Sequence, residues 1–186
     1  DGLLLKATAT RSEVGNRFFA INDGMSAIVN PDTLAPRRNE IRFNGVLSSY
    51  NQLAQFDPAT GAVTFNGTSP VDAPIGTHSV LSLFYALRSF NLKPSKDSKN
   101  PVNDTRVAVF WGSQPYIFTL RPSESQVITV QGLKIASQMV SITTQNQYLD
   151  ELNPRVWLGN DERRLPLKFS FGTIEGELIS PALLPR

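Results

Sequence analysis

The chain contains no cysteine, and this absence excludes several chemistries at once. Disulfides, thiolate metal sites and cysteine nucleophiles all require that residue. His78 is the only histidine, so metal sites built from several histidines are excluded too. We expect His78 to be exposed in the first turn of a helix without a catalytic role, since Ser79 and Ser82 beside it lack a nucleophile-elbow signature. The sequence therefore predicts no catalytic residues, no metal and no cofactor.

Charge is scarce as well. Only 18% of residues are charged, and 18 basic against 16 acidic residues leave a formal net charge of +2. No basic stripe interleaved with aromatic residues is present, so we expect no nucleic-acid partner. No apolar run approaches the roughly 18 residues of a membrane span, and no glycine-rich phosphate loop appears. A length of 186 residues allows one domain with a substantial core, or at most two small ones. No linker divides the chain cleanly, so we predict one β-rich domain over residues 1–186.

Alternation of apolar and polar residues marks the most secure local structure, a hairpin near the carboxyl end. The run Leu165–Phe171 has the period of a half-buried strand, and Gly172-Thr173 supplies a two-residue turn with glycine first. Counting outward from the turn pairs an aromatic with a glycine and a cation with a carboxylate. The expected pairs are Phe171 with Ile174, Ser170 with Glu175, Phe169 with Gly176, Lys168 with Glu177 and Leu167 with Leu178.

Short strand-like runs separated by turn residues continue through most of the chain. Asn44-Gly45 is a strong two-residue hairpin signal, and Asp57–Gly61 has the composition of a tight turn. The stretch Tyr148–Pro154 is expected to be a polar connection. The other expected strands are Leu3–Thr10, Arg17–Ile21, Met25–Val29, Arg37–Phe43, Val46–Phe56, Ala62–Phe65, Thr105–Trp111, Tyr116–Leu120, Gln126–Val130, Leu133–Thr143 and Val156–Leu158.

One helix is expected, over Thr77–Phe90. Apolar residues recur there with helical period, and Thr77 or Ser79 is suited to the N-cap. Arg88 suits the carboxyl end of the helix dipole. The following stretch, Leu92–Asp104, has no period and little apolar content, so it predicts an exposed loop. The residues of the expected buried helix face are Val80, Leu83, Phe84 and Leu87, widened by Leu81.

Several strands are apolar on both sides, which constrains the fold class. In Thr105–Trp111, for example, Val107 and Val109 alternate with Ala108 and Phe110. Such strands indicate a sheet that is covered on both faces or curled around a filler. We therefore predict a mainly β fold, a curved antiparallel, barrel-like sheet clasping one α-helix.

Three stretches carry a resemblance to a known family: Val80–Phe90 (VLSLFYALRSF), Ser123–Ser137 (SESQVITVQGLKIAS) and Val156–Phe169 (VWLGNDERRLPLKF). With the turn Asp57–Gly61 and in this order, they resemble the bacterial exported family called domain of unknown function 3108, from about Leu5 onward. The resemblance implies a curved antiparallel sheet similar in shape to periplasmic lipoprotein carriers, and no established activity. It also implies a periplasmic or envelope location and a further amino-terminal hairpin that this chain lacks.

The densest polar cluster, Asp161–Arg164, allows two interpretations. It is either an anion or substrate site that Arg88 joins from the helix, or a turn whose carboxylate caps backbone N–H groups and pairs with a nearby arginine. We favour the turn. Trp111 and Trp157 either line an apolar cavity or belong to the core, and the core is the more frequent role. The candidate ligand-binding residues are Arg88, Trp111, Trp157, Asp161 and Arg164.

The leading functional hypothesis is a non-enzymatic exported envelope protein that binds an apolar or lipid-like ligand in the concave face of its sheet. A protein–protein interaction or scaffold module without a ligand is the alternative. A hydrolase acting on envelope polymers through Asp161 or Glu162 with Arg164 is a third hypothesis, and it requires two carboxylates facing each other across a cleft.

Overall fold

The computed structural model describes residues 2–8, 23–95 and 103–178, apart from the side chains of 45–47. The chain divides into two compact units. Unit 1 comprises residues 1–86 and 108–116, and unit 2 comprises residues 87–107 and 117–186. The division falls within two strands, β7 (Thr105–Trp111) and β8 (Gln114–Val130).

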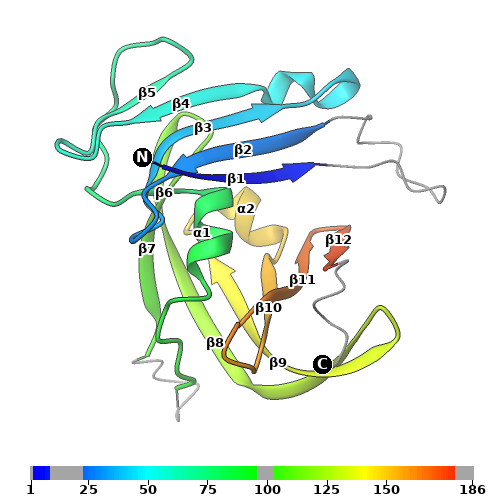
Figure 1. The fold of residues 1–186 in the computed structure, drawn as a ribbon. Coiled ribbons are helices and arrows are strands. Elements are labelled where there is room, and N and C mark those ends of the chain that lie inside the picture. The colour runs from blue at the N-terminus through cyan, green and yellow to red at the C-terminus, as the bar shows by residue number, and fades with distance from the viewer. Residues whose placement is uncertain (1, 9–22, 96–102, 179–186) are drawn as a thin grey trace. The chain divides into compact units, whose positions relative to one another are not determined.

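Unit 1 is built on a five-stranded antiparallel sheet in sequential order (Figure 1). Consecutive strands pair with each other in a meander, and each pair has a defined register. One face carries apolar side chains inward, among them Leu5, Ala27 and Val29, which pack with Leu81. The strands are β1 (Leu3–Thr8), β2 (Gly24–Val29), β3 (Pro36–Arg42), β4 (Gln52–Phe56) and β5 (Val63–Phe65).

The helix of unit 1, α1, is shorter than the sequence predicts. It spans Val80–Ala86, because His78–Ser79 form strand β6, which pairs in parallel with Val109 and Phe110. Ser79 caps the helix: its hydroxyl accepts the N–H of Ser82 at 3.2 Å, and the Ser82 hydroxyl accepts the N–H of Ser79 at 2.9 Å.

The buried face of α1 also differs from the predicted one. Leu81, Ser82, Leu83 and Ala86 are buried, whereas Val80 and Phe84 are only partly buried. Ser82 is not among the residues of the expected face, and its burial follows from the bonds that it makes with Ser79 in the cap. Leu87 is buried as expected but lies beyond the end of the helix.

His78 is buried, with 7% of its surface exposed, so the prediction of an exposed histidine is wrong. Its Nδ1 atom lies 3.0 Å from the Ser82 hydroxyl, and the backbone of Leu34 is a second hydrogen-bonding partner. Burial lowers the pKa of His78, and the bond with Leu34 opposes that shift. The residue therefore ties the β2–β3 turn to the start of the helix.

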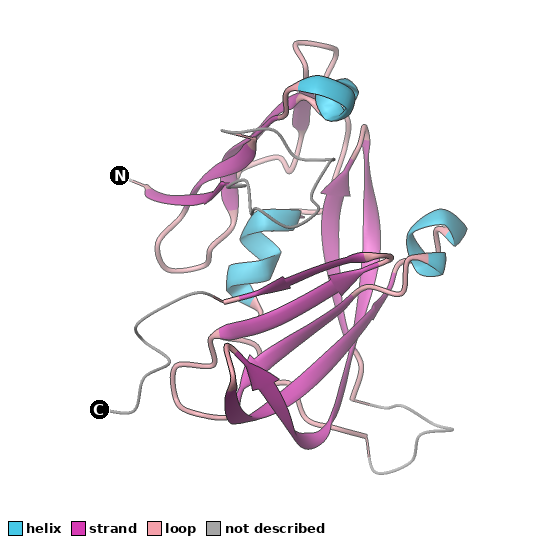
Figure 2. Ribbon diagram, turned by 90° about the vertical axis from the view of Figure 1, so that its right-hand side faces the viewer, coloured by secondary structure: helices cyan, strands magenta, loops and turns pink. Residues whose placement is uncertain are grey.

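Unit 2 is built on five antiparallel strands in the order β12-β11-β10-β9-β8 (Figure 2). A β-bulge between Pro122 and Ser125 lets β8 continue as one long strand where the sequence predicts two. Gln131-Gly132, both with positive φ, form the tight turn from β8 to β9. The other elements are β9 (Leu133–Thr143), α2 (Gln147–Glu151), β10 (Arg155–Gly159), β11 (Pro166–Phe171) and β12 (Ile174–Glu177).

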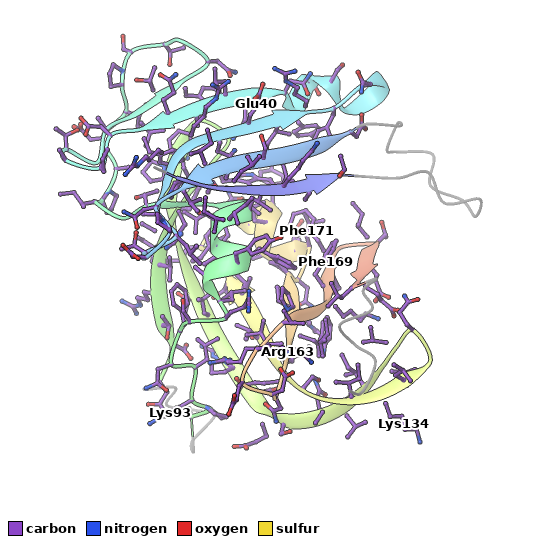
Figure 3. The ribbon with its side chains drawn as sticks, viewed as in Figure 1. Glu40, Lys93, Lys134, Arg163, Phe169 and Phe171 are labelled. Carbon is purple, nitrogen blue, oxygen red and sulfur yellow. The ribbon has the colours of Figure 1, made fainter. Side chains whose placement is uncertain are left out.

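The carboxyl-terminal hairpin has the register that the sequence predicts. Phe171 pairs with Ile174 and Phe169 with Gly176, and Gly172 has a φ of 62° at the turn. A Cβ atom on Gly176 would overlap the ring of Phe169, so the aromatic side chain covers the glycine as expected. Figure 3 shows Phe169 and Phe171 on the same side of β11.

Two local predictions are wrong. Asn44-Gly45 is not a two-residue turn, because a 3-10 helix, η1 (Gly45–Tyr50), joins β3 to β4. Tyr148–Pro154 contains most of α2, whose N-cap Asn146 accepts two backbone N–H groups. The described ends of the stretch Leu92–Asp104 form a loop, as predicted, but they are anchored, since Leu92 is buried and Asp104 pairs with Arg121 at 2.8 Å.

The prediction of a mainly β protein with a curved, largely antiparallel sheet is confirmed, with β6–β7 as a parallel pair. Helix α1 packs against β1, β2 and β6 of unit 1. The single domain over residues 1–186 stays a prediction. The expected strand Arg17–Ile21 lies outside the described residues. In the part of the chain that the structure describes, no helix is long and apolar enough to cross a membrane.

Candidate functional site

The turn between β10 and β11 contains the polar cluster that the sequence predicts. One oxygen of Asp161 accepts the backbone N–H of Arg164 at 3.1 Å, and the other accepts Nε–H of Arg163 at 2.8 Å. The Asp161 carbonyl also accepts the Arg164 N–H at 3.1 Å, which closes the turn. The carboxylate thus has the structural role that we favoured, in which a short acidic side chain caps its own turn.

Arg88 and Arg164 join this turn to the segment that follows α1. Arg88 donates Nε–H to the carbonyl oxygen of Arg163 at 2.9 Å, and Arg164 donates from Nη1 to the carbonyl oxygen of Phe90 at 2.7 Å. Each segment therefore supplies one guanidinium and one carbonyl to the other. The structure brings Arg88 together with Asp161 and Arg164, as expected if Arg88 joins the polar cluster.

Arg164 is the most constrained member of this group. Its side chain is partly buried, and its backbone has a φ of 46°, a left-handed conformation that costs energy for a residue other than glycine. Burial lowers the pKa of Arg164, because desolvation disfavours the charged form. Within the described residues, neither Arg164 nor Arg88 forms an ion pair.

Trp157 lies on β10 of unit 2, on a sheet face that we call the Trp157 face. The opposite face carries Val156 and Leu158, which are 5% and 0% exposed and belong to the core. Trp157 is partly buried and pairs with Met139 of β9 on one side and Lys168 of β11 on the other. Adjacent residues on β10 thus point to opposite faces, and Trp157 is an apolar residue on a face that also carries Arg155 and Lys168.

An apolar patch extends from Trp157 along the β8–β9 hairpin, and we call it the Trp157 strip. The registers place its members on one face of the sheet. Val130 is fully buried, Leu133 is 36% exposed and the remainder are partly buried. The sequence analysis missed every member except Trp157, although alternation within Leu133–Thr143 carries the signal. The strip consists of Trp157, Met139, Ile135, Leu133, Ile128 and Val130.

The turn of this hairpin approaches the far edge strand of the same unit. Gln131 contacts the carboxylate of Glu177 on β12 through its backbone N–H at 3.4 Å and its side-chain amide at 3.3 Å. Strands β8 and β9 bend strongly as they run to this turn (Figure 1). Glu177, Lys168 and Trp157 are successive cross-strand neighbours, so they share one face of the sheet. The contact between Gln131 and Glu177 therefore brings the end of the hairpin over the Trp157 face.

The charged side chains beside the strip are paired differently from the prediction. Lys168 faces Glu177 in the register, but its Nζ atom bonds Glu175 at 2.9 Å. Glu175 is the diagonal neighbour on the same face, within reach of a long side chain, while Gln131 contacts Glu177. The Lys168 ammonium also lies 5.8 Å from the centroid of the Trp157 ring.

The fifth predicted ligand residue, Trp111, belongs to a different unit from the other four. Trp111 ends β7 and belongs to unit 1, whereas Arg88, Trp157, Asp161 and Arg164 belong to unit 2. Trp157 lies on the strip, and the remaining three form the arginine-rich turn. The predicted set thus divides over three locations.

Unit 1 carries an open hollow of about 450 Å³ at the end of the β3–β4 connection. Its amides already serve the backbone: the Asn51 side chain bonds both the N–H and the carbonyl of Phe43, and Asn66 accepts the N–H of Leu53. We therefore assign the hollow no ligand. It is lined by Glu40, Ile41, Arg42, Phe43, Asn44, Asn51, Gln52, Leu53 and Asn66, none of which is a predicted ligand residue.

Comparison with known proteins identifies a family. The family model described as "Protein of unknown function (DUF3108)" matches residues 5–179, which is most of the chain. The chain therefore belongs to this family, as the sequence resemblance indicates. No curated protein matches the chain. No solved structure matches it either.

Proposed function

We propose that this DUF3108 protein is a non-catalytic binding protein that holds an apolar, lipid-like group, namely a fatty-acyl chain, against the Trp157 strip of unit 2. The observation that carries the proposal is that the strip is apolar yet incompletely buried, although the opposite face of β10 and of the adjoining end of β9 already supplies a core. A second apolar face is costly to leave in water.

The shape of the strip favours a chain-like occupant. Its members follow one face from β10 across β9 to the end of the β8–β9 hairpin, interrupted by Ser137 and its partner Gln126, so they form a band and not a compact pocket. The bend of the hairpin toward Glu177 puts that band on a concave surface. Acyl chains, which make only apolar contacts along their length, match such a band.

Lys168 gives the strip one polar end. Its side chain is only 22% exposed and lies over the ring of Trp157, with Glu175 as its partner. A cation that is held beside an apolar band suits a ligand whose apolar chain ends in an anionic group, with Glu175, 61% exposed, free to turn into solvent. We propose this amphipathic class of ligand.

A catalytic role receives less support. The hydrolase hypothesis needs a carboxylate that faces a second one across a cleft, but both oxygens of Asp161 bond groups of their own turn. Glu175 is paired with Lys168. We therefore propose a binding protein and not an enzyme.

Native mass spectrometry of freshly purified protein tests the proposal. We expect an adduct with the mass of a fatty acid or lipid, and we expect Met139→Lys to remove it by placing a charge on the strip. Val127→Lys is the matched control, because Val127 lies on the same hairpin but on the opposite face and is 66% exposed. The proposal fails if the wild-type protein carries no adduct and binds no added fatty acid, or if both variants behave alike.

A location in the bacterial cell envelope is part of the proposal. It rests on the sequence resemblance to exported proteins, and a lipid-like ligand is consistent with it. Fractionation of cells that produce the native full-length protein checks it: we expect the protein in the periplasmic or envelope fraction, and recovery in the cytoplasmic fraction alone would contradict this location.

An interaction module is the second candidate, supported by the outer face of the unit 1 sheet. Leu4 and Ile28 lie opposite each other on β1 and β2 and are 62% and 40% exposed. A second copy of the chain is the partner that we consider. Sedimentation of the wild type and of Leu4→Lys distinguishes the cases: a dimer that the substitution dissociates supports this candidate, and a wild-type monomer contradicts it.

A further inference from the structure

The arginine-rich turn of unit 2 holds more positive charge than its carboxylates neutralise. Three arginines, Arg88, Arg163 and Arg164, adjoin two acids, Asp161 and Glu162. Arg163 is paired with Asp161, whose second oxygen is occupied by a backbone N–H, and Glu162 is exposed. Two guanidinium groups therefore lack an acidic partner within the described residues.

Both of these guanidinium groups are fixed in place. Arg88 and Arg164 each use one N–H to bond a carbonyl oxygen of the other segment, at 2.9 and 2.7 Å. A guanidinium has five N–H donors in a planar fork, so each keeps donors that the described residues do not use. Because the carbonyl bonds already restrict these side chains, a bound anion would cost little further side-chain entropy.

The local energetics point to an anion as well. Arg164 is partly buried, and a desolvated cation without a counter-charge is unfavourable. Its left-handed backbone is a second local cost, and such costs concentrate at binding sites. A carbonyl dipole bonded to Nη1 compensates only part of the charge. A negatively charged group would complete the site.

We propose that Arg88 and Arg164 together bind a phosphate group, with Arg163 and Asp161 holding the turn in shape. Two planar forks supply paired donors to the oxygens of a phosphate, and a group with more than one negative charge suits two unpaired cations. The proposal concerns a different part of unit 2 from the Trp157 strip and does not depend on an acyl ligand. The phosphate belongs either to a soluble ester or to a lipid headgroup.

Titration of the intact chain with inorganic phosphate, followed by NMR of the arginine Nε–Hε groups, tests the site. We expect saturable shifts of the Arg88 and Arg164 signals with a Kd on the order of 1 mM. Loss of one fork in Arg88→Gln should weaken binding about tenfold or more. Arg164→Lys keeps the positive charge but removes the planar fork, so it should also weaken phosphate binding. This conservative variant provides a second test if Arg88→Gln fails to fold.

Arg106→Gln is the matched control, because Arg106 is an exposed arginine of the same unit whose loss should leave the affinity unchanged. The proposal is overturned if sodium chloride of equal ionic strength produces the same shifts, or if Arg88→Gln and Arg106→Gln bind phosphate equally well. Once phosphate binds, glycerol phosphate and vesicles of phosphatidylglycerol identify the source: tighter binding of the first assigns a soluble ester, and Arg88-dependent sedimentation with the second assigns a headgroup. Vesicles of phosphatidylcholine serve as the neutral control.

Discussion

The Nε atom of Arg88 lies 2.9 Å from the carbonyl oxygen of Arg163, 75 residues later in the chain. The bond ties the segment after α1 to the β10–β11 turn. A second bond joins the same two segments in the opposite direction, because Arg164 of the turn donates to the carbonyl oxygen of Phe90. These two bonds fix the positions of both arginines of the proposed phosphate site.

Loss of the Arg88 bond should have a moderate cost. Arg88→Gln is expected to lower the free energy of unfolding by about 1 kcal/mol, since the bond is charge-assisted but exposed. Urea denaturation measures the change, with Arg106→Gln as the control expected to stay within about 0.5 kcal/mol of the wild type. Equal effects of the two substitutions would show that the bond does not contribute.

His78 should make unit 1 sensitive to mild acid. Its folded-state pKa lies below the ordinary histidine value of 6.5, so the unfolded chain takes up its proton first as the pH falls. The stability that neutral His78 contributes is complete above pH 6.5 and is lost as the pH falls through the folded-state pKa. Urea midpoints measured between neutral pH and about pH 5, above the ordinary range of the carboxylates, should decline in the wild type and stay flatter in His78→Gln. Parallel curves would refute the assignment.

Alanine substitutions at two glycines of unit 1 distinguish the cost of backbone strain from the cost of steric overlap. Gly61 and Gly76 have φ values of 79° and 84°, so alanine is strained at both. A Cβ atom on Gly61 would overlap the carbonyl oxygen of Ala73, whereas nothing lies within 4 Å of one on Gly76. Gly61→Ala should therefore destabilise the protein by about 1–3 kcal/mol more than Gly76→Ala. Thermal or urea unfolding of the two variants makes the comparison, and equal losses would contradict the described packing.

The pairing of Lys168 can be measured with two double-mutant cycles. The cycle of Lys168 with Glu175 should give a coupling of about 0.5 kcal/mol, as for other exposed pairs, and the cycle of Lys168 with Glu177 should give nearly none. The hairpin register alone predicts the reverse. A larger coupling to Glu177 would therefore show that the directly opposed pair dominates in solution.

The contrast between the two hairpin signals explains what the sequence predicts well. Gly172-Thr173 adjoins strands whose alternation agrees with the turn, so the register from Leu167 to Leu178 follows from local chemistry. Asn44-Gly45 has an equally strong turn signal, but η1 forms there instead. The amide of Asn44 bonds Asp23, a residue 21 positions away, and no local pattern reveals that contact.

The same distinction applies to the helix and to the candidate sites. His78–Ser79 read as the first turn of a helix, but pairing with Val109 and Phe110 makes them a strand, a tertiary contact that overrides local propensity. The cap that Asp161 forms within its own turn is local and was predicted. The sequence also predicts that Arg88 converges on this turn, but the two carbonyl bonds of Arg88 and Arg164 are long-range contacts that no local pattern reveals. The Trp157 strip depends on contacts across the sheet, so the sequence identifies only Trp157.

Fluorescence quenching of Trp157 tests the central proposal most directly. The chain has two tryptophans, Trp111 and Trp157, so Trp111→Phe leaves Trp157 as the only indole. Titration of this variant with a brominated fatty acid should quench its emission in a saturable manner, and adding Met139→Lys should abolish the effect. Absence of saturable quenching of Trp157, or quenching that persists in the variant with Met139→Lys, would contradict an acyl chain bound on the Trp157 strip.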